Sequence, residues 1–288
     1  MSETNDKETD QNQNHEKHLK FENNKWTFPR PNNILLDLYG CVASWNFIQD
    51  TLKPYFYQHI QSYLEEHWND NKIQRIIQRF REQAIIHQNY DSNIPQIEAA
   101  DKDKESVLNS AIVHIRWLAQ SGNRTSYDAY NILRNLIWTD GYKSGQLKTH
   151  VFDDVPDAFH QWRMVQFIKL YGFASGPSEG QKLYYKSTIK GDLTKYFNNF
   201  IDASGKKKLD PKKYEILAKS LRDIPKNIVF FTDSTEEAKA AQEAGMISVV
   251  VIREGNSQYD QRQLQNLYSI KSLNQIEFDE SSAAPPCC

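Results

Sequence analysis

Two aspartates stand at the ends of apolar runs and carry the clearest chemistry in this chain. Asp37 follows Ile34–Leu36 and precedes a glycine turn, and Asp233 comes shortly after Ile228–Phe231. A buried carboxylate is costly unless a charged or hydrogen-bonding group meets it. In α/β proteins such residues collect in ligand crevices at the carboxyl ends of strands. We therefore interpret Asp37 and Asp233 as parts of one site.

Further polar groups follow the same pattern. Ser175 follows another apolar run, Phe167–Phe173, and the lysines Lys206, Lys207 and Lys208 stand just before an expected helix. Right-handed crossovers bring the ends of parallel strands to one edge of a sheet. Two carboxylates there repel each other unless a cation lies between them, and oxygen ligands with few protein donors suit Mg²⁺. Acids, a metal ion and a lysine around one anion make a phosphoryl-transfer site.

The elements that position these residues alternate between strands and helices. From about Val155, short apolar runs alternate with helical segments, and the runs fall at 167–173, 197–201, 228–231 and 247–252. Such alternation predicts a parallel sheet with helices on both faces. Residues 50–147 instead have apolar side chains three and four apart, which predicts helices. The expected fold class is α/β, with a Rossmann-like parallel sheet core and an inserted helical cap.

Four parts are expected along the chain. Residues 1–25 and 277–288 are polar and lack the apolar side chains that folding requires, so we expect a disordered N-terminal tail and a flexible C-terminal tail. The α/β core is expected over 26–49 and 148–276, and the helical cap over 50–147.

The composition argues against several classes of protein. The formal net charge is −2 over 288 residues, so there is no basic excess to bind nucleic acid. No stretch approaches about 18 consecutive apolar residues, so no transmembrane segment is expected. The three cysteines, Cys41, Cys287 and Cys288, are too few for a disulfide framework and indicate a reducing compartment. We expect the cytoplasm, with the nucleus also compatible. Lipid attachment at Cys287 and Cys288 is a weaker alternative to an unmodified tail, because no polybasic patch lies nearby.

The motifs occur in an order that resembles the haloacid dehalogenase superfamily, and within it the enolase-phosphatase family, also called acireductone synthase. The resemblance covers roughly residues 32–275. The matching segments are Asp37-Leu38-Tyr39-Gly40-Cys41, Phe47 to Tyr55, Ala174-Ser175-Gly176, Gln181-Lys182-Leu183, Ser187-Thr188 with Gly191-Asp192-Leu193, Thr232-Asp233 with Glu237, and Arg253 with Gly255-Asn256.

The resemblance implies a nucleophile and a metal site. Asp37 would be the nucleophile that forms an aspartyl-phosphate. Mg²⁺ would be held by Asp37, by the backbone carbonyl of Tyr39 and by Asp233.

The resemblance also implies a substrate and the groups that bind it. Lys207 would hold the phosphate, with Lys206 and Lys208 left open as alternatives, and Ser175 and the residue at position 174, Ala174, would bind it as well. The substrate would be a small phosphorylated metabolite, a diketo phosphate ester with a methylthio group, of the methionine salvage type. The helical insertion would be the cap over the site.

The chain departs from the family pattern at the chemistry itself. Tyr39 stands where the family has an acid that serves as general acid and base, and a phenol with a pKa near about 10 is a poor base at neutral pH. Ala174 stands in place of a phosphate-binding serine, and Cys41 in place of a threonine. These departures leave three interpretations. The chain is an enolase-phosphatase with reduced turnover, or a pseudophosphatase that acts as a metal-binding, phosphate-binding or protein-interaction module, or a protein that accepts a phosphoryl group on Asp37 without hydrolysing it.

Two other residues have simpler interpretations. Glu237 is expected to be an acid in the first turn of a helix, where the helix dipole favours it. Cys41 is expected to be a buried, unreactive thiol rather than an activated one.

Overall fold

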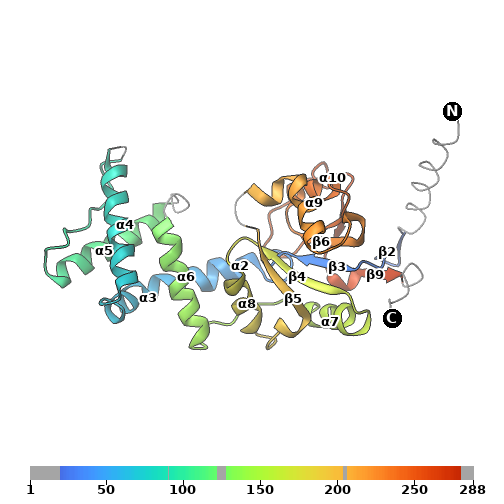
Figure 1. Cartoon of the computed structure of the whole chain (residues 1–288), viewed down its shortest axis with the longest axis horizontal. Helices are drawn as coiled ribbons and strands as arrows, with labels where there is room; N and C mark the ends of the chain where they lie inside the picture. Colours follow the sequence, from blue (N-terminus) through green and yellow to red (C-terminus); the bar gives the residue numbers. More distant parts are fainter. Residues whose placement is uncertain (1–19, 90, 122–127, 204–205, 280–288) are drawn as a thin grey trace. The chain divides into compact units, whose positions relative to one another are not determined.

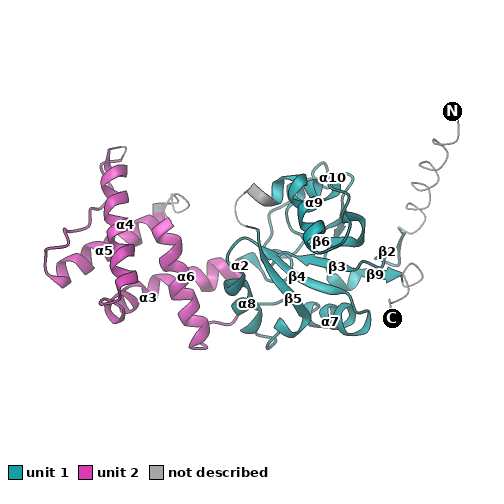
Figure 2. Cartoon of the chain, viewed as in Figure 1, with its two compact units in different colours: residues 1–45, 149–288 teal, residues 46–148 magenta. Residues whose placement is uncertain are grey.

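The computed structural model describes residues 20–89, 91–121, 128–203 and 206–279. The chain divides into two compact units, one of Met1–Trp45 with Thr149–Cys288 and one of Asn46–Lys148 (Figure 2). We call them unit 1 and unit 2. The expected tail over residues 1–19 and the terminal cysteines Cys287 and Cys288 lie outside the described residues. No described helix has the length and apolar character that a membrane crossing requires.

Unit 1 is built on a six-stranded parallel sheet with strand order β5-β4-β3-β6-β7-β8 (Figure 1). Its strands are β3 (Asn33–Leu36), β4 (Lys169–Ala174), β5 (Phe197–Asp202), β6 (Ile228–Thr232), β7 (Ile247–Val251) and β8 (Tyr268–Ile270). The predicted α/β fold with a parallel sheet is confirmed. The predicted strand at 167–173 begins two residues too early, because Phe167 adopts a positive φ of 56° and leaves its ring 73% exposed. The short strand β8 was not predicted.

A second, three-stranded sheet of order β1-β2-β9 joins the two ends of the described chain. Its strands are β1 (Lys20–Glu22), β2 (Lys25–Pro29) and β9 (Ile276–Asp279), and β2 pairs with β9 in parallel. The prediction placed residues 20–25 and 277–279 in the tails, which differs from this structure. Their polar composition hid the pairing, and the buried apolar side chains of the paired strands β2 and β9 are Phe28, Ile276 and Phe278.

Helices cover both faces of the six-stranded sheet. They are α7 (Val155–His160), α8 (Ser178–Lys186), α9 (Pro211–Ser220) and α10 (Thr235–Glu243), with a π-helical turn η3 (Gln161–Val165) and short 3₁₀ turns η4 (Thr194–Tyr196), η5 (Lys206–Leu209), η6 (Pro225–Asn227) and η7 (Leu273–Gln275). Because successive strand residues point to opposite faces, Leu36 and Phe231 pack in a core with α7 and α8. Leu35 and Phe230 pack in a second core with α9 and α10 (Figure 1). The sheet is therefore buried on both sides.

Unit 2 consists of helices, as its apolar spacing predicts. They are α3 (Lys53–Glu66), α4 (Asn71–Gln88), α5 (Lys104–Ser121) and α6 (Asp128–Lys143), preceded by α2 (Trp45–Phe47) and the π-helical turn η1 (Ile48–Leu52). Pro54 occupies the first turn of α3, where its missing N–H costs nothing. The buried faces carry residues three and four apart, including Phe56, Ile60 and Leu64 on α3.

Candidate active site

Asp37 begins the loop after β3 and lies in a network of buried charges. Its backbone N–H donates to the Phe231 carbonyl of β6 at 3.0 Å, which fixes it at the carboxyl edge of the sheet. One carboxylate oxygen accepts from the Leu38 N–H at 3.0 Å. The other lies 2.5 Å from the Nζ of Lys208, and that ammonium also lies 3.2 Å from an oxygen of Glu237. Lys208 thus bridges two carboxylates.

Lys208 is held in place by both polar and aromatic groups. Its side chain is 6% exposed, and its ammonium lies over the rings of Phe173 at 5.5 Å and Phe230 at 6.0 Å. Its carbonyl accepts from the Tyr214 hydroxyl at 2.8 Å. Burial alone would lower the pKa of Lys208, but the adjacent carboxylates outweigh it and raise that pKa. The side chain therefore stays charged at neutral pH.

Of the three lysines that the prediction left open, Lys208 makes a contact with Asp37. The side chain of Lys207, the residue that the prediction favoured, lies outside the described part of the structure. Spacing along the sequence does not give the orientation of consecutive lysines in the tight turn η5, which comes between β5 and α9. Glu237 lies in the first turn of α10, as predicted, and it also accepts a hydrogen bond from Thr232 at 2.9 Å and pairs with Lys208. Burial raises the pKa of Glu237, and the charge of Lys208 opposes the shift.

Asp233 follows the adjacent strand β6 and faces the loop after β3. A Cβ added at Gly40 would lie 2.4 Å from the Asp233 carboxyl carbon, so this loop contacts the carboxylate through its backbone. The indole N–H of Trp45 donates to one Asp233 oxygen at 2.6 Å, and the Tyr259 hydroxyl donates to the Asp233 carbonyl. Burial raises the pKa of Asp233 to about 6; the Trp45 hydrogen bond and the Lys208 charge oppose the shift, and the charge of Asp37 adds to it.

The donor set at this edge fits a hard divalent cation. Asp37 and Asp233 come from the ends of neighbouring strands, in the register Leu36 opposite Phe231. Among the described residues, no group of three or more His, Cys, Asp or Glu side chains could hold a metal ion. Two carboxylates with a backbone carbonyl suit Mg²⁺, which keeps several waters and takes few protein ligands. The raised pKa of Asp233 shows the electrostatic cost that a cation there would relieve.

The remaining predicted site residues lie at the same edge. Tyr39 packs its ring against Trp45 at 5.6 Å and Tyr184 at 6.4 Å between centroids. Ala174 ends β4 and is buried, while Ser175 immediately after it is exposed. Since β4 pairs with β3 in parallel, Ser175 follows the strand next to that of Asp37.

Several residues brace these loops, and their role could not be assigned from the sequence. The Gln181 amide donates at 2.9 Å to the carbonyls of Ala174, Gly176 and Ile201, which shapes the turn that carries Ser175. Arg253 donates to the Cys41 carbonyl at 3.1 Å and pairs with Asp154 at 2.9 Å.

One further contact and a buried thiol complete the loop after β3. Asn256 donates to the Gly40 carbonyl at 3.1 Å. The predicted burial of Cys41 is confirmed, and burial followed by the charges of Asp233 and Asp37 raises its pKa well above the usual range.

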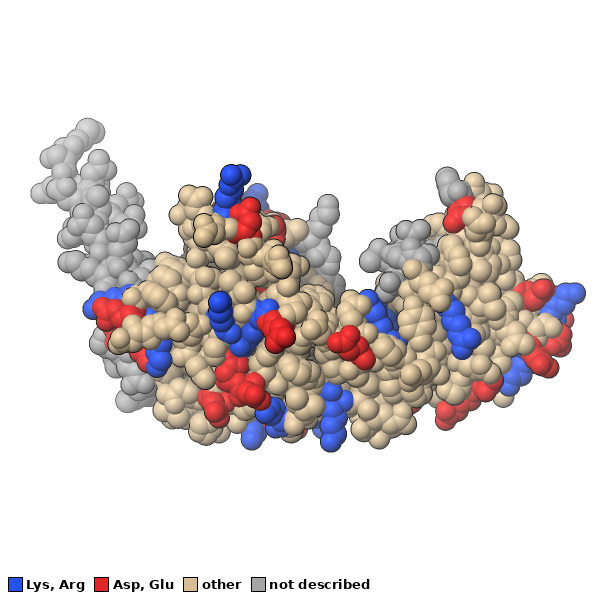
Figure 3. All heavy atoms as spheres, turned by 180° about the vertical axis from the view of Figure 1, so that it is seen from behind, with Lys and Arg blue, Asp and Glu red and all other residues tan. Residues whose placement is uncertain are grey.

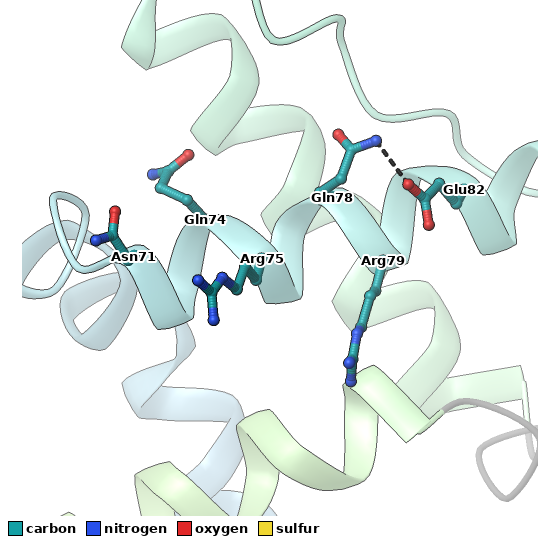
Figure 4. Close-up of a pocket in the computed structure, with 6 residues that line it drawn as sticks. All are labelled: Asn71, Gln74, Arg75, Gln78, Arg79 and Glu82. Carbon is teal, nitrogen blue, oxygen red and sulfur yellow. Dashed lines mark hydrogen bonds between the residues drawn. The ribbon is translucent and has the colours of Figure 1, made fainter.

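Among the described residues, the surface along α4 differs from the buried charge network around Asp37. Lys and Arg side chains are interspersed with Asp and Glu on the face drawn in Figure 3. A hollow of ≈ 590 Å³ lies along α4 and is lined by side chains of that one helix (Figure 4). The lining residues are Asn71, Gln74, Arg75, Gln78, Arg79 and Glu82. Gln78 donates to Glu82 at 2.8 Å, and the hollow has the character of a solvated polar helix face.

The six-stranded parallel sheet, with acids after β3 and β6 and a buried lysine after β5, defines an α/β fold of the haloacid dehalogenase type. In structure, the chain is similar to the UTR4 protein of Saccharomyces cerevisiae, with a TM-score of 0.64, 21% identity, and coverage of 85% of this chain and 99% of that one. At this identity the likeness concerns the fold. No protein-family model matches the chain.

In sequence, the chain is 33% identical over 246 residues to Enolase-phosphatase E1 of Xenopus tropicalis, covering 85% of this chain and 94% of that protein. It is 30% identical over 246 residues to Enolase-phosphatase E1 of Anopheles gambiae, covering 85% and 82% respectively. The chain belongs to the enolase-phosphatase E1 family, which confirms the resemblance in its motifs.

Proposed function

We propose that the chain binds Mg²⁺ and a small phosphorylated metabolite at the Asp37 edge of the sheet, and acts there as a phosphatase of low turnover. The observation that carries this proposal is the position of Asp37, which is held by the buried Lys208 at 2.5 Å and neighbours Asp233 on the next strand. Membership in the enolase-phosphatase E1 family supports a diketo phosphate ester of the methionine salvage type as the substrate. A cytoplasmic location agrees with this substrate.

Each residue has a defined part in the proposed reaction. A carboxylate oxygen of Asp37 attacks the phosphorus atom, the bond from phosphorus to the leaving oxygen breaks, and the leaving group takes up a proton. Water then attacks the aspartyl-phosphate, gives up a proton, and releases inorganic phosphate and the Asp37 carboxylate. Lys208 orients Asp37 and balances the phosphoryl charge. Ser175 and the backbone at Ala174 bind the phosphoryl oxygens. Mg²⁺, held by Asp37, the Tyr39 carbonyl and Asp233, would neutralise the remaining charge.

The second step is the slow one in this proposal. The position that would activate water is Tyr39, whose ring contacts the rings of Trp45 and Tyr184. A positioned general base is worth about 10²–10⁴-fold in rate, and a phenol supplies little of it at neutral pH. The aspartyl-phosphate on Asp37 should therefore accumulate.

The test is a rapid-mixing experiment with an aryl phosphate and Mg²⁺. We expect a burst of the phenol product equal to the protein concentration, followed by slow release of phosphate, and no burst in Asp37→Asn. Tyr39→Glu should increase the slow rate, whereas Tyr39→Phe, which keeps the ring and adds no base, should not. Steady phosphate release without a burst, at a rate within tenfold of an intact family member, would contradict slow hydrolysis.

The alternative function is a pseudophosphatase that binds Mg²⁺ and phosphate without turnover. The same aromatic packing of Tyr39 favours it, because it fills the catalytic position with a ring. Beryllofluoride binding that depends on Mg²⁺, measured by thermal shift, together with no burst and no phosphate release, would select this alternative.

A further inference from the structure

Asp233 is held from three directions, and one of the contacts comes from a residue with no role in the function proposed above. The backbone of Gly40 lies directly against its carboxyl group. The Tyr259 hydroxyl donates to its carbonyl. The Trp45 indole N–H donates to its Oδ2 at 2.6 Å. Among these three contacts, the hydrogen bond from Trp45 is the one in which a side chain donates to a carboxylate oxygen of Asp233.

The Trp45 ring is itself oriented by the residue at the altered catalytic position. The rings of Trp45 and Tyr39 are 5.6 Å apart and tilted by 35°, and Tyr39 in turn contacts Tyr184 on α8. Trp45 is 39% exposed, and its contact with the Tyr39 ring and its indole hydrogen bond hold the ring. A continuous path of contacts therefore runs from Tyr184 through Tyr39 and Trp45 to the Asp233 carboxylate.

We propose that Trp45 is a positioning residue for the cation ligand Asp233, and that Tyr39 acts through it. An indole N–H on one carboxylate oxygen restricts the rotation of the carboxyl group that would hold the cation. Hydrogen bonds of this kind to metal-binding carboxylates typically account for 10- to 100-fold in metal affinity. Where the family has a catalytic acid, this chain has Tyr39, whose ring supports Trp45. This substitution favours binding of the cation over turnover. This inference rests on the proposed Mg²⁺ site.

Equilibrium dialysis of the full chain against Mg²⁺ provides the test. Trp45→Phe keeps the ring and removes only the donor, and we expect it to weaken Mg²⁺ binding about 10- to 100-fold. Trp26→Phe is the matched control, since Trp26 donates its indole N–H to the Ser269 carbonyl at 3.2 Å in a different part of unit 1. This control should bind Mg²⁺ like the unaltered protein.

A spectroscopic measurement separates positioning from general structural damage. Mg²⁺ titration should change the tryptophan emission of the unaltered protein and of Trp26→Phe, and the change should be largely absent in Trp45→Phe. Circular dichroism of all three proteins should be the same. An equal or stronger Mg²⁺ affinity in Trp45→Phe would overturn the proposal and show that the indole competes with the cation or has no influence on it.

The part assigned to Tyr39 is tested by a double-mutant cycle. If Tyr39 acts through Trp45, Tyr39→Leu should weaken Mg²⁺ binding in the unaltered background and have little effect in Trp45→Phe. Effects that multiply independently would overturn the coupling. If the variants show this coupling in Mg²⁺ binding but the protein releases no phosphate, only the proposed phosphatase activity is contradicted. If the protein releases phosphate but Trp45→Phe leaves Mg²⁺ affinity unchanged, only the positioning role of Trp45 is contradicted.

Discussion

Unit 1 and unit 2 stabilise their interiors differently. Unit 1 buries Lys208 between Asp37 and Glu237, and buries Arg253 against Asp154. Among the described residues of unit 2, the fully buried side chains are apolar except for His114. Buried charge is costly and is retained where chemistry needs it, while apolar packing alone suffices to hold helices together. The contrast supports placing the proposed chemistry in unit 1.

The largest effect should come from removing the central cation of unit 1. Lys208→Met leaves two buried carboxylates facing each other, and breaking a buried ion pair in this way costs about 3–5 kcal/mol. Lys102→Met is the control, because Lys102 is exposed in unit 2 and surface substitutions stay within about 0.5 kcal/mol. Urea denaturation followed by circular dichroism measures both. Equal losses in the free energy of unfolding for the two variants would contradict the proposed difference between the interiors of the two units.

The second prediction concerns the apolar interior of unit 2. Ile60 on α3 is fully buried, and Ile60→Ala should cost about 2–5 kcal/mol through lost burial and the cavity left behind. Ile34→Ala in β3, which is equally buried, should cost a similar amount. The two variants should differ in Mg²⁺ affinity, since Ile34 lies three residues before Asp37 and Ile60 belongs to the other unit. Weaker Mg²⁺ binding in Ile60→Ala but not in Ile34→Ala would contradict the assignment of the site to unit 1.

Local patterns account for the parts that the sequence predicted well. Alternation of strands and helices indicated the parallel sheet. The expected helix after the three lysines is α9, which begins at Pro211 and is capped by the Asp210 side chain, which accepts from the Lys212 N–H. The acids Asp37 and Asp233 were recognisable because a carboxylate after a buried strand is unusual.

The misses have a common cause, since each depends on contacts between distant parts of the chain. The pairing of β2 with β9 joins two short segments about 250 residues apart. Whether Lys207 or Lys208 faces Asp37 depends on the path of the turn η5. The contact between Trp45 and Asp233 spans 188 positions, and nothing local to Trp45 marks it as part of a site.

The smallest effect, and the finest test of the comparison, is the response of unit 2 to pH. His114 on α5 is fully buried, donates from Nδ1 to the Pro95 carbonyl at 2.7 Å, and lies edge-on to Phe80. Burial lowers the pKa of His114 below its ordinary value near 6.5, and the hydrogen bond to Pro95 opposes the shift. The unfolded chain therefore takes up a proton at a higher pH than the folded one.

The sign of the pH dependence follows from this difference. The contribution of neutral His114 to stability is fully present above about pH 6.5, and it is lost as the pH falls below that value toward the lower pKa of the folded state. His114→Gln keeps a donor for the Pro95 carbonyl and cannot titrate, so the variant should lose less stability than the unaltered protein between pH 7 and pH 5. Other titrating groups are common to both proteins and cancel in the difference between their urea midpoints. If the stability of His114→Gln and of the unaltered protein changes with pH in the same way, unit 2 tolerates a buried charge as unit 1 does. The difference between the two interiors would then lie in their packing alone.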